Sequence, residues 1–388
     1  MKRSLERILT THTGSLPRPD DLMPLLRAKE AGEAYDGGAL AAQVKLAVAE
    51  AVRMQAAAGV DIVNDGEMSK PSYATYVKDR LAGFQGEKSS GLRAADLADF
   101  PSFSKRGGRE SGVTVIKRPS CAAPITYRDL DAVRIDAENL RAGLAGVKYE
   151  EAFISAASPG VVSFFLSDNY YKNHERYIRA LAEAMKTEYD AIVAAGYILQ
   201  VDCPDLAMSR HIQFKDLSLA EFRKTIELHI DALNHALADV PPDRSRLHLC
   251  WGNYEGPHHH DVALRDILDI VLKARPQGLS YEASNPRHEH EWVVFKEIKL
   301  PAGKVLIPGV IDSVTNFVEH PELVAQRVEN LASVVGRENV IAGTDCGFAQ
   351  APFTRRVHPT IQWAKLRAQA EGARIATAKL WGRTSATA

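Results

Sequence analysis

The sequence predicts an α/β protein of the (β/α)₈ TIM-barrel class, and three observations carry this expectation. Short apolar segments alternate with longer amphipathic ones along the 388 residues, which is typical of a mostly parallel sheet covered by helices. Eight such units follow one another, which suggests closure into a barrel. No glycine-rich phosphate loop follows an early strand, which disfavours the competing fold, an open doubly wound sheet.

The expected strands are apolar runs of strand length that end in polar or turn residues. In chain order they lie at 8–14, 60–66, 151–158, 197–203, 246–252, 279–284, 305–312 and 339–346. Several of the helices between them end in glycine, as helix C-termini commonly do, and the clearest lie at 41–59, 177–196 and 321–336. A polar, Gly- and Ser-rich region at about 83–125 breaks the alternation, and we expect an inserted arm near the barrel mouth there.

Composition narrows the function classes. The chain is 45% hydrophobic and 25% charged, as in an ordinary globular protein, and we expect residues 1–388 to form one catalytic domain. A formal net charge of −1 gives no electrostatic reason to expect nucleic acid or a membrane as partner. The chain shows no signal-peptide core and no membrane-spanning apolar stretch, so a cytoplasmic protein is expected. The four cysteines are few and far apart, which favours thiols or metal ligands over disulfides.

Polar residues end nearly every expected strand, where barrel enzymes hold their active sites. They are His12 and Ser15, Asp65 and Glu67, Ser155 and Ser158, Asp202, His248 and Cys250, Glu282, Asp312, and Asp345 and Cys346. Any single Asp or Ser in this set is explained equally well as a helix cap. Helix capping does not explain the two thiols and the imidazole.

These thiols and the imidazole indicate a metal site. His248 and Cys250 are two residues apart on one strand, so their side chains point the same way. Cys346 ends the last strand at the same height, and Glu282 ends a strand between them. Two Cys, one His and one oxygen ligand suit Zn²⁺. The alternative is a purely structural role, because buried cysteine is common in protein cores.

The ligand types also indicate a reaction. Two thiolates, one carboxylate and a neutral imidazole leave the zinc site with about one net negative charge, which makes a weak centre for hydrolysis. A substrate thiol at such a site would be bound as a thiolate at neutral pH and stay nucleophilic. The residues therefore favour alkylation of sulfur, with no catalytic residue assigned beyond the zinc site.

Nearly the whole chain resembles the catalytic barrel of cobalamin-independent methionine synthases and its short single-barrel relatives. The resemblance is carried, in the family's order, by THTGSLPRP, IVNDGEMSK, LQVDCPDLA, RLHLCWGNY, SYEASNPR and GTDCGF. It implies Zn²⁺ as the cofactor, with the ligands His248, Cys250, Glu282 and Cys346. The implied reaction is methyl or alkyl transfer from a donor to a small-molecule thiol, above all S-methylation of homocysteine in methionine biosynthesis.

The same resemblance assigns the residues that bind the thiol substrate. It places Ser15 at the amino-acid portion of that substrate, and it places Glu67 and Asp202 at its amino group. Two positions depart from the family's pattern. Cys203 follows Asp202 where the family has an acidic residue, and Val314 stands where the family has a histidine near the end of the seventh strand.

The same residues also fit other functions. The short relatives include epoxyalkane:coenzyme M transferases, which use the same zinc motif to add a thiol to an epoxide. In that reaction Arg355 or Arg356 would neutralise the sulfonate of coenzyme M. A barrel like uroporphyrinogen decarboxylase, with no metal, is a further alternative, and so is a non-catalytic zinc protein. The sequence fixes neither the alkyl donor, the physiological thiol nor the oligomeric state.

A run of histidines in GPHHHD, at 256–261, follows the zinc strand. The His258–His260 cluster has three open interpretations, namely a second metal site, a substrate contact at the barrel mouth and a solvated loop. We expect His288 and His290 at the surface. Trp251, which neighbours Cys250, is expected to point away from the zinc and to pack behind the strand.

Overall fold

The computed structural model describes residues 1–86, 94–107, 118–349, 353 and 355–382. Six parallel strands form one sheet in the order β2–β5–β6–β7–β8–β9. They are β2 (Ile62–Asn64), β5 (Glu151–Ala157), β6 (Ile198–Asp202), β7 (Ser245–Leu249), β8 (Gly278–Tyr281) and β9 (Val305–Pro308). A second parallel pair joins β1 (Leu9–Thr10) to β10 (Ile341–Ala342). The predicted α/β fold with a parallel sheet is confirmed, and each expected strand overlaps an observed one.

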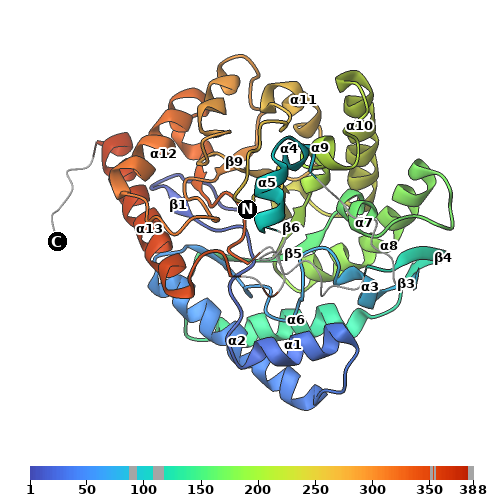
Figure 1. Ribbon diagram of the computed structural model, residues 1–388. Coiled ribbons are helices and arrows are strands. Elements are labelled where there is room, and N and C mark those ends of the chain that lie inside the picture. The colour runs from blue at the N-terminus through green and yellow to red at the C-terminus, as the bar shows by residue number, and fades with distance from the viewer. Residues whose placement is uncertain (87–93, 108–117, 350–352, 354, 383–388) are drawn as a thin grey trace.

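Isolated parallel bridges connect the two sheets. Thr11 bridges to Ile62, so the end of β1 lies beside β2. On the other side, Leu306 bridges to Val340 and Gly309 bridges to Gly343, so β9 lies beside β10. Figure 1 shows the helices arranged around the outside of these strands.

The outer helices follow the strands in the βα alternation expected from the sequence. They are α1 (Leu22–Ala31) and α2 (Gly37–Ala57) after β1, α6 (Leu130–Gly143) before β5, α7 (Pro159–Phe165) and α8 (His174–Ala194) after β5, α9 (Ser209–Ile212) and α10 (Leu219–Ala236) after β6, α11 (Leu268–Val271) after β7, α12 (Pro321–Val335) after β9, and α13 (Pro359–Trp381) after β10. Local caps fix several starts: Asn173 accepts from the amide of Arg176 at α8, and Ser218 and Glu221 form a capping box at α10.

Two apolar cores hold the strands in place. The larger lies between the strands and the outer helices. The smaller is formed by seven inward-facing residues of six strands, namely Leu9, Ile62, Phe153, Ile198, Val305, Ile307 and Ile341. Above this small core the buried Arg246 stacks on Phe153, with its guanidinium carbon 3.5 Å from the ring centroid. The space between these strands is therefore filled with side chains.

The last helix ties both ends of the chain to the strands. Gln369 of α13 donates to the carbonyls of Thr11, Ala342 and Gly343, so one buried amide group serves β1 and β10 together. The amide of Thr13 also donates to the hydroxyl of Thr344, 331 residues away in the sequence. The seam between the first and last strands is thus closed by polar contacts.

A long excursion leaves the alternation between β2 and β5. It contains α3 (Val77–Arg80), β3 (Leu81–Gln85), α4 (Ala95–Asp99), α5 (Pro101–Gly107) and β4 (Ser120–Tyr127), and β3 pairs with β4 in antiparallel fashion. This is the region where the sequence predicts an insertion at 83–125, of which 87–93 and 108–117 lie outside the described residues. In Figure 1, α4 and α5 lie in front of the strands, and α4 contacts α9.

Within the described ranges, no helix combines the length and the apolar character that a membrane crossing requires.

Candidate functional site

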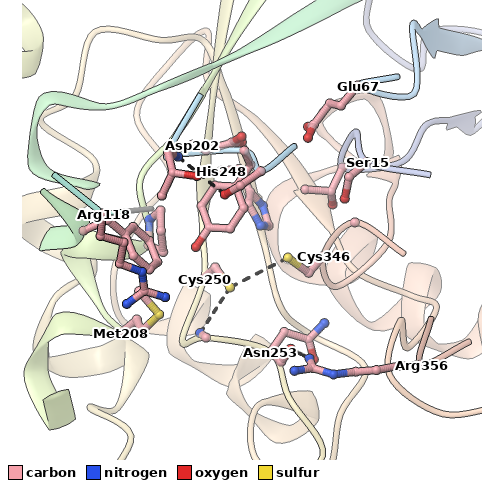
Figure 2. Close-up of a pocket in the computed structure, with 18 residues that line it drawn as sticks. Ser15, Glu67, Arg118, Asp202, Met208, His248, Cys250, Asn253, Cys346 and Arg356 are labelled. Atoms are coloured by element: carbon pink, nitrogen blue, oxygen red, sulfur yellow. Dashed lines mark hydrogen bonds between the residues drawn. The ribbon is translucent and has the colours of Figure 1, made fainter. Parts of the chain in front are cut away.

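A cavity of about 180 Å³ opens where the parallel strands end. Its walls contain six of the seven residues expected to bind the metal or the substrate, namely Ser15, Glu67, Asp202, His248, Cys250 and Cys346. These come from the ends of β1, β2, β6, β7 and β10, so the parallel arrangement brings together residues far apart in the sequence. Figure 2 shows the sulfur atoms in the middle of this cavity, with Glu67 and Asp202 on one side of them.

The thiols and the imidazole form a compact cluster. One ligand atom each from His248, Cys250 and Cys346 lies within 4.8 Å of the other two. The two Sγ atoms are 3.9 Å apart, far beyond a disulfide bond of about 2.05 Å. Two sulfurs on one zinc, at about 2.3 Å each in tetrahedral geometry, lie about 3.8 Å apart. The spacing therefore fits a shared metal ion.

The hydrogen bonding and protonation of the His248 imidazole also suit a metal ligand. Its Nδ1 lies 3.2 Å from the hydroxyl of Ser280 on β8, whereas its Nε2 is buried and makes no hydrogen bond. Burial lowers the pKa of His248 to about 3, so the ring is neutral at physiological pH. A neutral histidine that has one nitrogen bonded to a supporting group and the other free is the usual arrangement of a metal ligand.

Glu282, the fourth ligand expected from the sequence, lies outside this three-residue cluster. Its Oε1 accepts from the amide of Trp251 at 2.7 Å, and its Oε2 accepts from Nδ2 of Asn285 at 2.8 Å. Burial, and then the neighbouring Cys250, raise its pKa well above the usual range. In this conformation Glu282 holds the backbone just after Cys250.

Glu67 lies on the carboxylate side of the cavity in an unusual backbone conformation. Its φ is +57°, a left-handed value that is uncommon for residues other than glycine. The turn is fixed by the carboxylate of Asp65, which accepts from the Glu67 amide at 3.0 Å, and by Arg18, which donates to the Glu67 carbonyl at 2.8 Å. Oε1 accepts from the hydroxyl of Ser155 at 2.7 Å, and Oε2 is buried with no hydrogen bond. Such local strain is typical of functional sites.

Asp202 ends β6 on the same side of the cavity. One carboxylate oxygen accepts from Nε2 of Gln200 at 2.8 Å. Burial, and then the charge of Glu67, raise the pKa of Asp202 well above its usual range. A cation between these two carboxyl groups would favour their ionised forms and so oppose the rise in the pKa of Asp202. Ser15 lies on the wall beside Cys346 and Glu67, and its Oγ accepts from the amide of Ala349 at 3.4 Å.

Two arginines also line the cavity. Arg356 reaches it after β10 and donates to the carbonyl of Asn253 at 2.9 Å, and Arg118 reaches it from the segment before β4. Arg356 is one of the two arginines expected from the sequence to bind an anion. Arg118 is not expected there, because nothing in the polar insertion marks this residue as part of the cavity. Arg355, by contrast, forms an ion pair with Asp20 at 2.7 Å and does not line the cavity.

The three histidines at 258–260 lie in two different environments. His259 and His260 are exposed and both contact Asp99, whereas His258 is largely enclosed and bonded to Asp261 at 2.8 Å. The expectation of a surface position for His288 is wrong. His288 is 3% exposed, because its ring bonds to Asp261 and Glu291 and stacks on Trp251 with centroids 4.0 Å apart. Trp251 itself is buried and packs behind the strand, as expected.

Comparison with known proteins gives this cavity a context. No family model matches the chain. A methionine synthase of Sulfurisphaera tokodaii is 26% identical over 346 residues, which are 88% of this chain and 86% of that protein. A methionine synthase of Saccharolobus solfataricus is 24% identical over 375 residues, which cover 96% and 95%. The chain is a homologue of the methionine synthases.

Solved structures of methionine synthases share the fold. A B12-independent methionine synthase from a Shewanella species, in complex with selenomethionine, superposes with a TM-score of 0.72 at 20% identity and covers 97% of this chain and 99% of that one. A putative B12-independent methionine synthase from Listeria monocytogenes gives a TM-score of 0.64 at 18% identity, covering 95% and 98%. The shared fold therefore extends along nearly the whole chain.

Proposed function

We propose that this protein is a zinc-dependent methyltransferase that alkylates a small-molecule thiol, with homocysteine as the foremost substrate and methionine as its product. The observation that carries the proposal is a shared cavity. The thiol–imidazole cluster and the buried carboxyl pair open into the same space, so one small molecule can present sulfur to the first and an ammonium group to the second. The names of the curated methionine synthases support the same reaction.

The proposed architecture is a single (β/α)₈ catalytic barrel over residues 1–388. The parallel bridges on both sides of the β1–β10 pair support it, because they connect that pair to β2 and to β9. The excursion between β2 and β5 is then an arm inserted near the barrel mouth.

The proposed metal ligands are His248, Cys250 and Cys346, joined by Glu282. The free Nε2 of His248 and the sulfur spacing support the first three. Glu282 must exchange one of its two hydrogen bonds before it can serve as the fourth. When bound, zinc lowers the pKa of a thiol ligand, so that the thiol is held as a nucleophilic thiolate at neutral pH.

The chain's own residues position the substrate. Glu67 and Asp202 bind the ammonium group of the amino acid, since the free Oε2 of Glu67 and the raised pKa of Asp202 both call for a cation. Ser15 contacts the amino-acid portion from the wall beside Cys346. Held at both ends, the sulfur points to the space where the alkyl donor enters, which reduces the entropy cost of transfer.

A second candidate is addition of coenzyme M to an epoxide, and one observation favours it. Arg118 and Arg356 line the cavity and offer two cations to a sulfonate. Homocysteine uses the carboxylate side of the cavity, whereas coenzyme M would use the arginine side.

Calorimetry of thiol binding separates these functions. We expect homocysteine to bind the zinc-loaded protein with release of about one proton at neutral pH, counted in buffers of different ionisation enthalpy, because a free thiol with a pKa near 8.5 is mostly protonated there. Elemental analysis of the same sample should give zinc in the wild-type protein. Tight binding of coenzyme M and none of homocysteine would select the second candidate. Binding of neither thiol would contradict both.

A further inference from the structure

A second group of side chains with the residue types and spacing of metal ligands lies outside the cavity. Asp96 of α4, His211 of α9 and Asp261 of the loop after β7 place one ligand atom each within 4.8 Å of the other two. The three segments are far apart in the sequence, and α4 lies beside α9 in Figure 1. The group therefore joins the excursion between β2 and β5 to α9 and to the loop after β7.

This cluster is buried and its polar atoms are not satisfied. Asp96 is 0% exposed and His211 is 2% exposed, and the side chain of Asp261 is 1% exposed. Both ring nitrogens of His211 lack a hydrogen bond, and so does one oxygen of each carboxylate, Oδ1 in both. His211 Nδ1 lies 3.2 Å from Asp261 Oδ1, close enough for an ion pair but without hydrogen-bond geometry. Unsatisfied buried polar groups are rare in native proteins, so this group needs an explanation.

The second oxygen of each carboxylate, Oδ2, is held by hydrogen bonds. Asp96 Oδ2 accepts from the hydroxyl of Tyr254 at 3.0 Å. Asp261 Oδ2 lies 2.8 Å from Nδ1 of His258 and 3.1 Å from Nε2 of His288. Each carboxylate is thus oriented through one oxygen and offers the other to the shared space. Supporting hydrogen bonds of this kind orient the ligands of metal sites.

Protonation states agree with a cation site. Burial lowers the pKa of His211, which keeps a lone pair available on the ring. Burial alone would raise the pKa of Asp261, but the hydrogen bonds from His258 and His288 outweigh it and lower that pKa. A neutral imidazole and an ionised carboxylate are the ligand forms that metals require.

We propose that Asp96, His211 and Asp261 bind one divalent metal ion of the first transition row and thereby clamp α4 to the mouth of the fold. Two carboxylate oxygens and one imidazole suit Zn²⁺, Mn²⁺ or Fe²⁺, and no thiol is present to select soft ions. The clamp reaches the active cavity through a short chain of contacts, since Asp261 bonds to His288, and His288 stacks on Trp251 beside Cys250. This inference does not depend on the proposed reaction.

The exposed group of Asp99, His259 and His260 provides a matched control. It also has metal-ligand spacing, and it lies on the same helix and loop. Its histidine nitrogens are already bonded to Asp99, at 2.8 and 2.7 Å, and all three residues are exposed. It lacks the buried unsatisfied atoms, so we expect it to bind metal weakly.

Metal titration of the full-length chain tests the proposal. In a Cys250→Ser/Cys346→Ser background, stripped with a chelator, we expect one equivalent of Mn²⁺ per chain by electron paramagnetic resonance and one of Zn²⁺ by calorimetry. Adding His211→Ala should abolish this equivalent, and adding His259→Ala/His260→Ala should leave it. Amide hydrogen exchange in α4 should slow on addition of Mn²⁺, except in the His211→Ala protein.

One further variant and one further comparison keep the test valid if a variant does not fold. If circular dichroism shows that His211→Ala is unfolded, His211→Gln preserves the size of the side chain and removes the imidazole. If the cysteine background is unfolded, wild-type protein should bind one equivalent more than the single His211 variant. The proposal is overturned if no ion binds in the folded cysteine background, or if binding is lost with His259 and His260 rather than with His211.

Discussion

The sulfur side and the carboxylate side of the cavity are built in different ways. His248 and Cys250 lie at the end of one strand, and the pairing of β7 with β6 and β8 sets their depth. Glu67 instead depends on a left-handed turn held by Asp65 and Arg18. Each side retains a buried polar atom without a hydrogen bond, His248 Nε2 and Glu67 Oε2. Regular pairing thus positions the proposed metal ligands, whereas a strained turn positions the proposed substrate carboxylate.

The largest expected effect is on the sulfur side. Cys250→Ser or Cys346→Ser should remove zinc and abolish thiol alkylation, because a serine hydroxyl is a poor replacement for a thiolate ligand. Elemental analysis, activity and circular dichroism on the same samples check this. Full zinc occupancy in both variants would show that the two thiols are not ligands. A folded protein that lacks zinc would separate a functional site from a structural one.

Asp202→Asn tests the carboxylate side. If the ammonium group of homocysteine binds there, the loss of a charge-assisted hydrogen bond should weaken thiol binding by about 1.5–3 kcal/mol, roughly 10- to 150-fold. Zinc content should stay at the wild-type level, which separates the two sides of the cavity. Asp205→Asn, which alters a neighbouring buried carboxylate that does not line the cavity, serves as the control. Unchanged homocysteine affinity in Asp202→Asn would favour coenzyme M.

His12, buried beneath the carboxylate side, should make stability depend on pH. Burial lowers its pKa from 6.5 to about 4, so the unfolded chain binds the proton more readily. Stability is therefore full above pH 6.5 and is lost as the pH falls from 6.5 towards 4, by about 2 kcal/mol between pH 7 and pH 5. Urea unfolding of the wild type and of His12→Asn at both pH values measures the difference. Equal pH dependence in the two proteins would contradict the assignment to His12.

Gly14→Ala should give the smallest effect and tests the turn most directly. Gly14 has a φ of +143°, and a Cβ there would lie 2.6 Å from Oε1 of Glu67. We expect a loss of about 1 kcal/mol in unfolding free energy, the lower end for a residue held in a sparsely populated backbone region, together with weaker thiol binding from a displaced carboxylate. Gly146→Ala, at a positive φ with no atoms near its Cβ, is the matched control for backbone strain alone. Equal thiol affinity in the two variants would mean that Glu67 does not bind the substrate.

Local sequence patterns were sufficient for the strands. The apolar runs end in polar or turn residues that mark where each strand stops, and β5 and β6 match their expected ranges to within one residue. The antiparallel pairing of β3 with β4 is not expected from the sequence, because both strands lie largely in a segment whose composition indicates only an insertion. Strand pairing across such a segment depends on contacts that local periodicity does not encode.

The candidate site is predictable from the sequence only where its residues end strands. Residues at strand ends were found because parallel strands bring their ends together. The position of Glu282 outside the cluster was not predictable, because the amide of Trp251 and the side chain of Asn285 compete for its oxygens. His288 was misplaced because its charged neighbourhood resembles a surface, although the charges are paired and buried. Amino-acid composition does not distinguish charged residues that are paired and buried from charged residues at the surface.

The polar seam between the first and last strands also bears on how the protein is made. Ser15 and Cys346 lie side by side in the finished cavity, yet the contact between Thr13 and Thr344 beside them closes a loop of 331 residues. At roughly 5–20 residues per second, a ribosome takes about 15–65 s to travel that distance. Throughout this interval β1 has no partner in β10, and Cys250, once synthesised, has no Cys346 beside it. The nascent chain must therefore complete almost its whole length before the cavity exists, and interrupted synthesis yields a polypeptide without the site.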